Sequence, residues 1–330
     1  MTTKTNIQAG YKDSSVGVIP QEWEVRRLSD LGEVYSGGTP DTENEEYWDG
    51  DILWCTPSDI TSLQTIYIYN TNKRITTKGL KHSSAILLPT NTIIVCTRAT
   101  IGNAVIAGTP LSTNQGFKNI IPKCCDAEWL LYSLISNKKQ LEKLACGSTF
   151  LEVSKKDFEN FKLPIPPIEE QRKIAEILGV WDEAIEKQSR LIEKLELRKR
   201  ALMQRLLTGR IHLPGFTTPW QKRRMKDCFE HITDTSNGCE YLPMTISARL
   251  GLISQKDKFD RVIAGDSLKK YTHIQKGDFA YNKGNSNLYE MGCIYRLKEQ
   301  DAVVPFVYIC FRPKQNVIGE FYQHFFINHG

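Results

Sequence analysis

The chain has 330 residues, of which 40% are hydrophobic and 25% are charged, and its formal net charge is +5. These values are typical of a soluble globular protein, and the length allows two domains of ordinary size plus a connector. No apolar run approaches the roughly 20 residues of a membrane span, and residues 1–15 lack the apolar segment of a signal peptide. The mild positive charge permits nucleic-acid binding without requiring it, because such binding depends on how the charges are arranged locally.

The nine cysteines are spread along the chain without any Cys-x-x-Cys pair. An odd number of cysteines without a secretory signal predicts reduced thiols and a cytoplasmic location. A zinc site needs ligands in closely spaced pairs, which neither the cysteines nor the six histidines provide. We therefore expect no structural metal site.

The first 50 residues contain few strand signals. Residues 1–22 are predicted to form a polar lead-in, and Trp23–Leu31 a short amphipathic element. Ser36–Pro40 has the composition of a turn, and the acidic residues 41–50 are predicted to form a loop.

Short β-branched or aromatic runs follow, separated by turn residues, and predict a mostly antiparallel sheet. The predicted strands are Ile52–Cys55, Ile66–Tyr69, Ile86–Leu88, Thr92–Cys96 and Ile101–Ile106. Residues 127–145 then carry apolar residues at helical spacing, which predicts a helix. The first domain is therefore α+β, and we place its end at residue 163.

The longest regular stretch is residues 164–210. A cluster of prolines, Pro164, Pro166 and Pro167, ends the preceding structure, because proline fits only the first turn of a helix. Glutamates follow at the start and arginines crowd the end, as the helix dipole favours, and Gly209 can end the helix. We predict one helix of about 39 residues, roughly 59 Å long at ~1.5 Å per residue.

A seam of alternating four- and three-residue steps runs along this helix, which is the heptad spacing of a coiled coil. The seam consists of Ile174, Leu178, Trp181, Ile185, Gln188, Ile192, Leu195, Lys199, Leu202 and Leu206. Polar Gln188 can fix the register at some cost in stability. The alternative is a long surface helix on one globular core, although typical helices of that kind have 8–20 residues. A seam needs a partner, and no second stretch of the chain has comparable heptads.

The starts of the two β-rich regions resemble each other. Trp23–Asp30 matches Trp220–Asp227 with a constant offset of 197 residues, and Pro20 and Pro219 precede them. This similarity suggests a duplicated unit. We therefore predict an α+β architecture with two β-rich domains, residues 1–163 and 211–330, separated by the helical segment 164–210.

Each predicted domain carries a polar tip after an apolar strand, and the two tips differ. The residues of the first tip are Thr97, Arg98, Thr100, Asn114 and Gln115; those of the second are Asn282, Lys283, Asn285 and Ser286. Side chains of these types read DNA bases in the grooves, while phosphate contacts position the protein. Two different tips on similar domains suit the reading of two DNA segments at a fixed separation. The alternative is that these residues form ordinary solvated turns.

The sequence lacks the motifs of common catalytic sites. There is no P-loop, no glycine-rich nucleotide-binding turn that opens a helix, no Gly-x-Ser-x-Gly and no His-Glu-x-x-His. The Asn/Asp-Pro-Pro-Tyr/Phe motif of amino-methylating enzymes is absent, and Asp49 and Asp51 lack a nuclease-type partner. We expect a reader without catalytic or metal-binding residues of its own.

These residues resemble a known family. The run Leu163-Pro-Ile-Pro-Pro-Ile-Glu-Glu-Gln-Arg-Lys-Ile-Ala175 and the Leu206–Gly209 ending are similar to the central conserved region of type I restriction–modification specificity subunits. Gly277–Lys283 and the tryptophans that start the two domains also fit, so that the resemblance covers nearly the whole chain.

The resemblance implies two target-recognition domains, each reading half of a split double-stranded DNA site, with conserved helices that set the spacing. It also implies methylation subunits, in two copies, that carry the S-adenosylmethionine chemistry, and restriction subunits that use ATP and Mg²⁺. The chain itself would bind no cofactor and would act in host defence and DNA methylation without being the catalyst. The alternative function is a coiled-coil scaffold with two β-rich modules that bind proteins rather than DNA.

One difference from the family concerns the end of the chain. Members of this layout close with a second proline-led helix, whereas here the sequence ends at Phe325–Gly330 within the second recognition domain. We expect a fragment, a truncated reading frame, or a subunit that takes its partner helix from a second copy or a C-terminal fragment.

Overall fold

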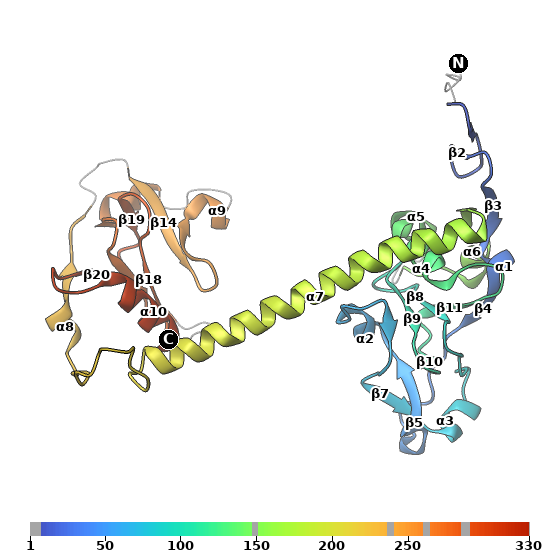
Figure 1. Cartoon of the computed structure of the whole chain (residues 1–330), viewed down its shortest axis with the longest axis horizontal. Helices are drawn as coiled ribbons and strands as arrows, with labels where there is room; N and C mark the ends of the chain where they lie inside the picture. The colour runs from blue at the N-terminus through green and yellow to red at the C-terminus, as the bar shows by residue number, and fades with distance from the viewer. Residues whose placement is uncertain (1–7, 147–150, 236–240, 260–264, 285–290, 330) are drawn as a thin grey trace. The chain divides into compact units, whose positions relative to one another are not determined.

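The computed structural model describes residues 8–146, 151–235, 241–259, 265–284 and 291–329. The chain divides into two compact units, residues 1–190 and 191–330, and the division falls within one long helix. Figure 1 shows the elements of both units. Among the residues described, every helix is too short or too polar to cross a lipid bilayer.

The first unit contains a mixed five-stranded sheet in the order β4-β11-β8-β9-β6. Its strands are β4 (Gly32–Ser36), β11 (Phe117–Pro122), β8 (Ile93–Cys96), β9 (Ala104–Ala107) and β6 (Tyr67–Ile68). All neighbouring strands are antiparallel except β6 and β9. Strand β11 pairs with β4 on one side and β8 on the other, so it joins the start of the unit to its middle.

A second sheet of the first unit has the order β10-β5-β7. It consists of β10 (Ser112–Thr113), β5 (Trp48–Cys55) and β7 (Lys73–Ile75), and β10 runs parallel to β5. Short elements accompany the sheets: β1 (Tyr11–Lys12), β2 (Ile19–Pro20), η1 (Glu45–Tyr47), α2 (Pro57–Thr61) and α3 (Thr77–Lys81).

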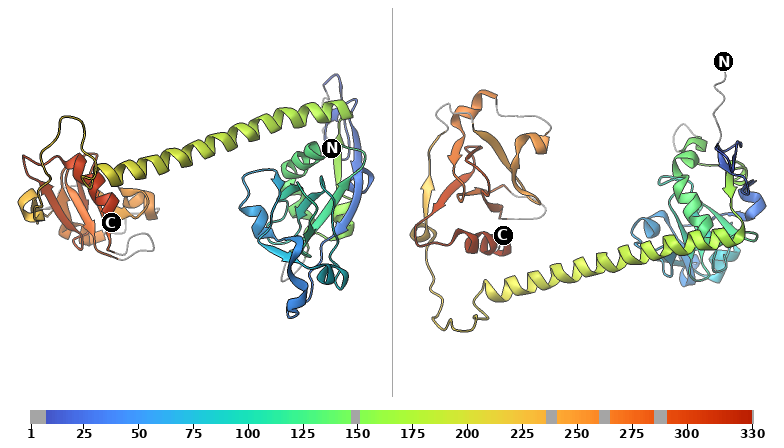
Figure 2. Two further views of the ribbon diagram at one scale, coloured as in Figure 1. Left: turned by 60° about the horizontal axis from the view of Figure 1, so that its bottom comes forward. Right: turned by 45° about the horizontal axis from the view of Figure 1, so that its top comes forward.

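Side chains alternate across β8 and thereby build two cores. Ile93 and Val95 face one core, which the helices cover, whereas Ile94 and Cys96 face the other, which the β5 sheet covers. The helical side consists of α1 (Leu28–Leu31), α4 (Ala127–Ser136), α5 (Lys138–Leu144), α6 (Lys155–Glu159) and the start of α7 (Ile168–Leu206). A strand pair, β3 (Glu24–Arg27) with β12 (Lys162–Ile165), completes this side. The first unit is thus a layer of helices, a sheet and a second sheet (Figures 1 and 2).

The second unit contains two four-stranded sheets. One has the order β13-β20-β17-β18 and the other β15-β14-β19-β16. Their strands are β13 (Phe229–Ile232), β14 (Leu242–Ser247), β15 (Gly251–Ser254), β16 (Thr272–Ile274), β17 (Phe279–Asn282), β18 (Cys293–Arg296), β19 (Ala302–Val304) and β20 (Ile309–Pro313). The helices are α8 (Met225–Cys228), α9 (Gln255–Phe259), η2 (Gly265–Lys270) and α10 (Gly319–His329). Residues of both sheets form the larger core, and α10 packs on a second, aromatic core.

The two units repeat one topology. The order β4-β11-β8-β9 in the first unit corresponds to β13-β20-β17-β18 in the second, and the parallel pair β5·β10 corresponds to β14·β19. The register agrees as well, because Ile93 pairs with Ile120 and Ile106, as Phe279 pairs with Phe311 and Arg296.

The sequence repeat has a local structural meaning. In each unit an aspartate accepts a hydrogen bond from the backbone N–H three residues earlier: Asp30 from Arg27 at 2.9 Å and Asp227 from Arg224 at 3.1 Å. This contact satisfies a free donor at the start of a short helix. The repeat found in the sequence therefore encodes the same helix start in both units.

The apolar faces of the two equivalent sheets are covered differently. In the first unit Leu141, Phe158 and Leu163, from α5, α6 and β12, are buried on this face. In the second unit α10 covers part of it, and a cavity of about 550 Å³ lies beside α8, lined by Met225, Lys226, Phe229, Glu230, His231, Tyr281, Ile294, Ile309, Phe311 and Phe326.

The predicted long helix is confirmed, since α7 has 39 residues. The α+β class with two β-rich units is confirmed too. The domain boundaries at residues 163 and 210 stay a prediction.

Several local predictions were wrong. Ile86–Leu88 is not a strand: Ile86 and Leu87 are exposed, and only Leu88 forms a bridge, to Leu111. Proline follows at position 89 and has no N–H to donate to a ladder. The supposed loop 41–50 contains η1 and the start of β5, where a bulge between Trp48 and Ile52 keeps the acidic residues outward.

Two further elements differ from the prediction. The helix predicted over residues 127–145 is broken at Asn137, whose side-chain amide donates to Ser133 O at 2.8 Å and ends α4 before α5 begins. Trp23–Leu31 is not a single element but strand β3 followed by α1. Strand β11 was not predicted at all.

The predicted turn Ser36–Pro40 packs closely against other backbone. A Cβ atom on Gly37 would lie 1.8 Å from Asn114 O, and one on Gly38 would lie 2.3 Å from Ala85 N. Trp54 donates its indole N–H to Gly38 O at 3.0 Å. Neither position therefore has room for a side chain, and Gly37 packs directly against the loop that contains Asn114.

We predict that Gly37→Ala destabilises the first unit by about 1–3 kcal/mol, because backbone must move to admit the methyl group. Thermal unfolding followed by tryptophan fluorescence measures this loss. The control is Gly179→Ala in α7, where the nearest atom to a new Cβ is Tyr132 Oη at 3.9 Å. Alanine there should be neutral or stabilise the helix by up to ~1 kcal/mol. Equal melting of the wild type and Gly37→Ala would contradict the packing argument.

Candidate nucleic-acid interface

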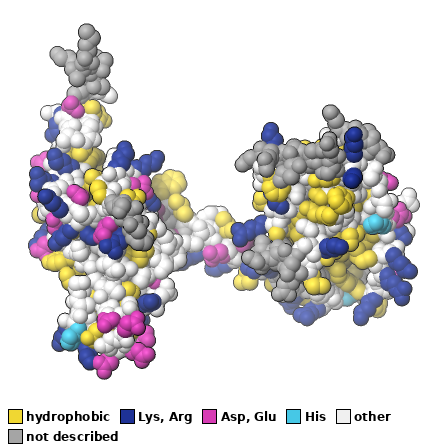
Figure 3. All heavy atoms as spheres, turned by 180° about the vertical axis from the view of Figure 1, so that it is seen from behind, with side chains coloured by type: hydrophobic (Ala, Val, Ile, Leu, Met, Phe, Trp, Pro, Cys, Tyr) yellow, Lys and Arg dark blue, Asp and Glu magenta, His cyan; other side chains and the backbone are white. Residues whose placement is uncertain are grey.

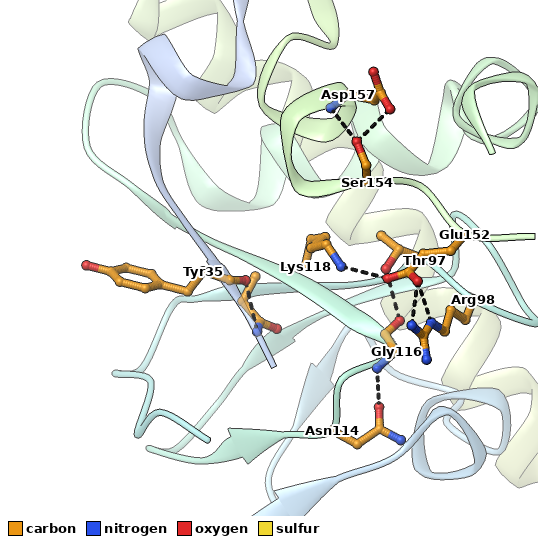
Figure 4. A network of polar contacts seen from close by, with 10 residues as sticks. Tyr35, Thr97, Arg98, Asn114, Gly116, Lys118, Glu152, Ser154 and Asp157 are labelled. Atoms are coloured by element: carbon orange, nitrogen blue, oxygen red, sulfur yellow. Dashed lines mark hydrogen bonds and ion pairs between the residues drawn. The ribbon is translucent and has the colours of Figure 1, made fainter. Parts of the chain in front are cut away.

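Pairing of β8 with β11 gathers the residues of the first predicted tip. Cys96 at the end of β8 pairs with Phe117 at the start of β11, and Thr97 N–H donates to Gly116 O at 2.8 Å. The loop after β8 and the loop before β11 therefore lie side by side, as Figure 4 shows. Arg98 and Asn114, which are distant in sequence, therefore lie on either side of Gly116.

The predicted residues of this tip differ in their exposure. Thr97 is 1% exposed, and its hydroxyl donates to Gly116 O at 3.1 Å, so it supports the loop from inside. Asn114 is half-buried and accepts from Gly116 N–H at 2.9 Å, which shapes the turn. Thr100 is half-buried, and Gln115 is exposed and accepts a hydrogen bond from Thr39. Gln115 and Arg98 are thus the members most open to a ligand.

Arg98 belongs to a charged network with Glu152 and Lys118 (Figure 4). Arg98 Nε lies 2.7 Å from Glu152 Oε2, and Lys118 Nζ lies 3.1 Å from Glu152 Oε1. Burial raises the pKa of Glu152, but the hydrogen bonds from Arg98 and Lys118 outweigh it, so that the net pKa lies below its usual range. Glu152 is therefore ionised at neutral pH.

The second predicted tip is at the end of β17. Asn282 is half-buried, and its side-chain oxygen accepts from Gly284 N–H at 3.0 Å. Lys283 is exposed, and within the described part of the chain its amine has no ion-pair partner. Asn285 and Ser286 lie outside the described residues.

The two tips occupy equivalent places in the fold. Because β8 and β17 share one register, Lys283 corresponds to Thr97, and each tip follows the strand that pairs with β11 or β20. The sequence suggested only a loose similarity here. The topology shows that different residues stand at the same strand end in each unit.

Charge is distributed unevenly between the units. Residues 191–330 contain 22 Lys and Arg against 14 Asp and Glu, whereas residues 1–190 contain 21 against 24. On the face seen in Figure 3, basic side chains outnumber acidic ones on the second unit, and acidic side chains gather at one end of the first. A polyanion would therefore meet a stronger attractive field on the second unit.

The start of α7 is fixed to the first unit by polar contacts. Gln171 is 2% exposed; its side-chain amide donates to Pro166 O at 2.8 Å and accepts from Asp126 N–H at 2.9 Å. Trp23 Nε1 donates to Glu170 at 3.0 Å. Gln171 thereby joins the proline turn to the start of α4.

About three turns further along α7, Asp182 accepts a hydrogen bond from Tyr132 Oη of α4 at 2.8 Å. Burial, together with this bond, raises the pKa of Tyr132. Ala175 is buried between the helices, and Ile174 packs against the same core. The first turns of α7 thus run alongside α4, as both ribbon figures show.

The remainder of the predicted seam is open. Leu178 is 38% exposed and Trp181 66%. The exposed or half-buried seam residues that follow are Ile185, Gln188, Ile192, Leu195, Lys199, Leu202 and Leu206. Only Ile174 of the predicted seam packs into the core of the first unit.

Cysteine and metal chemistry contribute little to these surfaces. The eight described cysteines are free thiols, and burial raises the pKa of Cys310 to about 12. Among the residues that the structure describes, no group of three or more His, Cys, Asp or Glu side chains is arranged to hold a metal ion.

Comparison with known proteins identifies the family. The profile of the type I restriction modification DNA specificity domain matches residues 20–197, which is more than half of the chain. The chain belongs to this family. The matched part contains the sheets of the first unit, the Gln171 contacts and most of α7.

Individual specificity subunits also resemble this chain in sequence. The MjaIX specificity subunit of Methanocaldococcus jannaschii is 42% identical over 193 residues, covering 57% of this chain and 45% of that protein. The EcoR124I/EcoR124II specificity subunit of Escherichia coli is 29% identical over 180 residues, covering 52% and 44%. The chain thus spans about half the length of the curated relatives it matches.

A solved chain from a type I restriction–modification system, in a study of complex assembly and conformational transition, superposes with a TM-score of 0.53. It is 15% identical and covers 93% of this chain and 80% of that one. This likeness supports the fold.

Sequence reasoning missed Lys118, Glu152 and the role of Gln171. Glu152 lies 54 residues from Arg98, and no local pattern indicates their contact. Gln171 was part of the family motif, but its burial depends on α4, which lies 45 residues away.

We predict that Gln171→Ala lowers the stability of the first unit by about 2–3 kcal/mol, because it leaves buried Pro166 O and the half-buried Asp126 N–H without partners. Circular dichroism during heating measures the effect. The matched control is Gln204→Ala, at an exposed position on the same helix outside the seam, which should change stability by less than about 0.5 kcal/mol. Equal effects of the two substitutions would contradict the role of Gln171.

Proposed function

We propose that this chain is a sequence-specific DNA-binding specificity subunit of a type I restriction–modification complex, and that it reads a split target. The observation that carries this proposal is the repetition of one topology with different polar residues at the equivalent strand ends. Family membership supports it. In this proposal each unit reads one half of the site through its tip.

The side chains at the tips suit this task. Arg98 and Lys283 can donate to guanine O6 and N7, and the amides of Gln115 and Asn282 can pair with adenine. The excess of basic residues in the second unit would contact phosphate, so affinity should fall steeply with salt. Acidic residues near η1 repel phosphate and direct DNA away from that end of the first unit.

The chain would supply recognition and no catalysis. We propose that methylation subunits, in two copies, provide the S-adenosylmethionine chemistry, and that restriction subunits provide the ATP- and Mg²⁺-dependent steps, all in the cytoplasm. The chain would hold none of these cofactors. Its contribution to the reaction is to place the methylation subunits over the correct adenines.

The exposed seam of α7 would contact a partner helix. Burying a side chain such as Ile185 contributes roughly 1.5–3 kcal/mol, so several together would stabilise an assembly strongly. The partner would be a second copy of the chain, a C-terminal fragment, or a helix of a methylation subunit.

Mapping of methylated adenines in cells that carry the chain with its methylation and restriction subunits tests the proposal. A split methylated sequence that disappears when this chain is deleted is expected. A mobility-shift titration on random duplex DNA distinguishes the scaffold alternative, since a protein scaffold would give no shift even at low salt.

We predict that Arg98→Ala impairs recognition of one half-site and Lys283→Ala that of the other. Each lost base contact should cost about 1–3 kcal/mol on the matching half-site. Binding to duplexes altered in one half at a time provides the measurement. If both substitutions weakened binding to every duplex equally, these residues would be phosphate contacts.

We also predict that charged substitutions in the seam, Leu178→Glu, Ile185→Glu and Ile192→Glu, disrupt assembly, because buried unpaired charge costs several kcal/mol. Light scattering and co-purification with the methylation subunit measure the change. The control is Glu183→Gln on the exposed face of α7, where an ion pair with Lys187 is solvent-exposed and contributes little. Unchanged assembly of the triple variant would refute the seam.

A further inference from the structure

One edge of the Arg98 guanidinium is occupied by a single carboxylate oxygen. Glu152 Oε2 lies 2.7 Å from Arg98 Nε and 2.5 Å from Nη2. The other oxygen, Oε1, is held by Lys118 Nζ at 3.1 Å. Lys118 has only 5% of its side chain exposed, so the network is anchored in the interior.

The backbone fixes Glu152 in the same place. Glu152 exchanges two backbone hydrogen bonds with Cys146, at 3.0 and 3.1 Å, and Val153 N–H donates to Thr97 O at 3.1 Å. Val153 itself is buried in the core. Both the carboxylate and the main chain that carries it are therefore positioned before any ligand arrives.

The contact with Glu152 determines which N–H groups of Arg98 remain available to a ligand. A guanidinium has five N–H donors, and Glu152 occupies Nε and one side of Nη2. Within the described residues no other acceptor contacts the guanidinium, and 43% of the Arg98 side chain is exposed. The remaining donors, on Nη1 and on the side of Nη2 that faces Nη1, form the forked edge that matches O6 and N7 of guanine.

The charge of Glu152 favours a base over a phosphate. The carboxylate offsets the positive charge of Arg98 and would repel a phosphate placed beside it, whereas a neutral guanine edge pays no such repulsion. A pre-positioned arginine also loses less conformational freedom on binding than a free one.

We propose that Glu152 is a positioning residue that presents Arg98 to a guanine in the half-site read by the first unit. The inference rests on the proposed function and deepens it, since it names the base and the residue that orients its reader. Lys118 acts one step further back, by holding the second oxygen of Glu152.

Selection from a randomised duplex library tests this, using the full chain and the variants Arg98→Ala, Glu152→Ala and Glu152→Gln. The wild type should select a motif with a guanine preferred about tenfold or more at one position. Arg98→Ala and Glu152→Ala should lose this preference at that position. Glu152→Gln retains an acceptor for Arg98 and should retain part of the preference. Glu183→Gln, in an exposed ion pair with Lys187 on α7, is the control and should leave this position unchanged.

Two further readouts separate positioning from a general structural effect. The preference in the other half-site must persist in each Glu152 variant, which shows that the protein is folded and bound. The dependence of binding on salt should keep its slope in Arg98→Ala, because only a lost phosphate contact lowers the slope, by about one.

Each alternative outcome decides against the inference. Full guanine preference in Glu152→Ala would overturn the positioning role while leaving the proposed function intact. A uniform loss with a reduced salt slope in Arg98→Ala would make this residue a phosphate contact. Failure of the wild type to select any motif would overturn the proposed function and this inference together.

Discussion

Two hydrogen bonds of one buried amide connect the start of the long helix to the first unit. Gln171 joins the carbonyl of Pro166 to the backbone N–H of Asp126, so the proline turn, the start of α4 and the start of α7 meet at one point. An unpaired buried amide would cost about 1–3 kcal/mol, which forces these three elements to form together. The direction in which α7 leaves the first unit, and hence the face on which its seam is exposed, depends on this contact.

The two units share one fold but carry different residues at their tips. Both units use one strand order and one register, which places their polar tips at equivalent strand ends. Their surroundings differ. In the first tip Arg98 is paired with Glu152, which also binds Lys118, whereas in the second tip Lys283 is exposed at the strand end. A shared scaffold with different tips allows two specificities without two folds, because the strand pairing tolerates changes in the loops.

Prediction from the sequence succeeded where the signal was local. The 39-residue helix, the α+β class and the duplicated unit were all visible in spacing and in short motifs. Prediction failed where the structure of a segment depends on strands that are distant in the sequence. Strand β11 was missed although it pairs with strands on both sides, and Ile86–Leu88 was assigned to a strand although no neighbouring strand extends its single bridge.

By itself, the sequence determined the helical period, the turns required by proline and glycine, and the residue types available at each tip. The tertiary structure decided which of those residues are accessible: it buried Thr97, paired Arg98 with Glu152 and left the seam beyond Ile174 open. The physical reason is that periodicity arises within one segment, whereas burial and ion pairing arise between segments that strand pairing brings together from 19 to 54 residues apart.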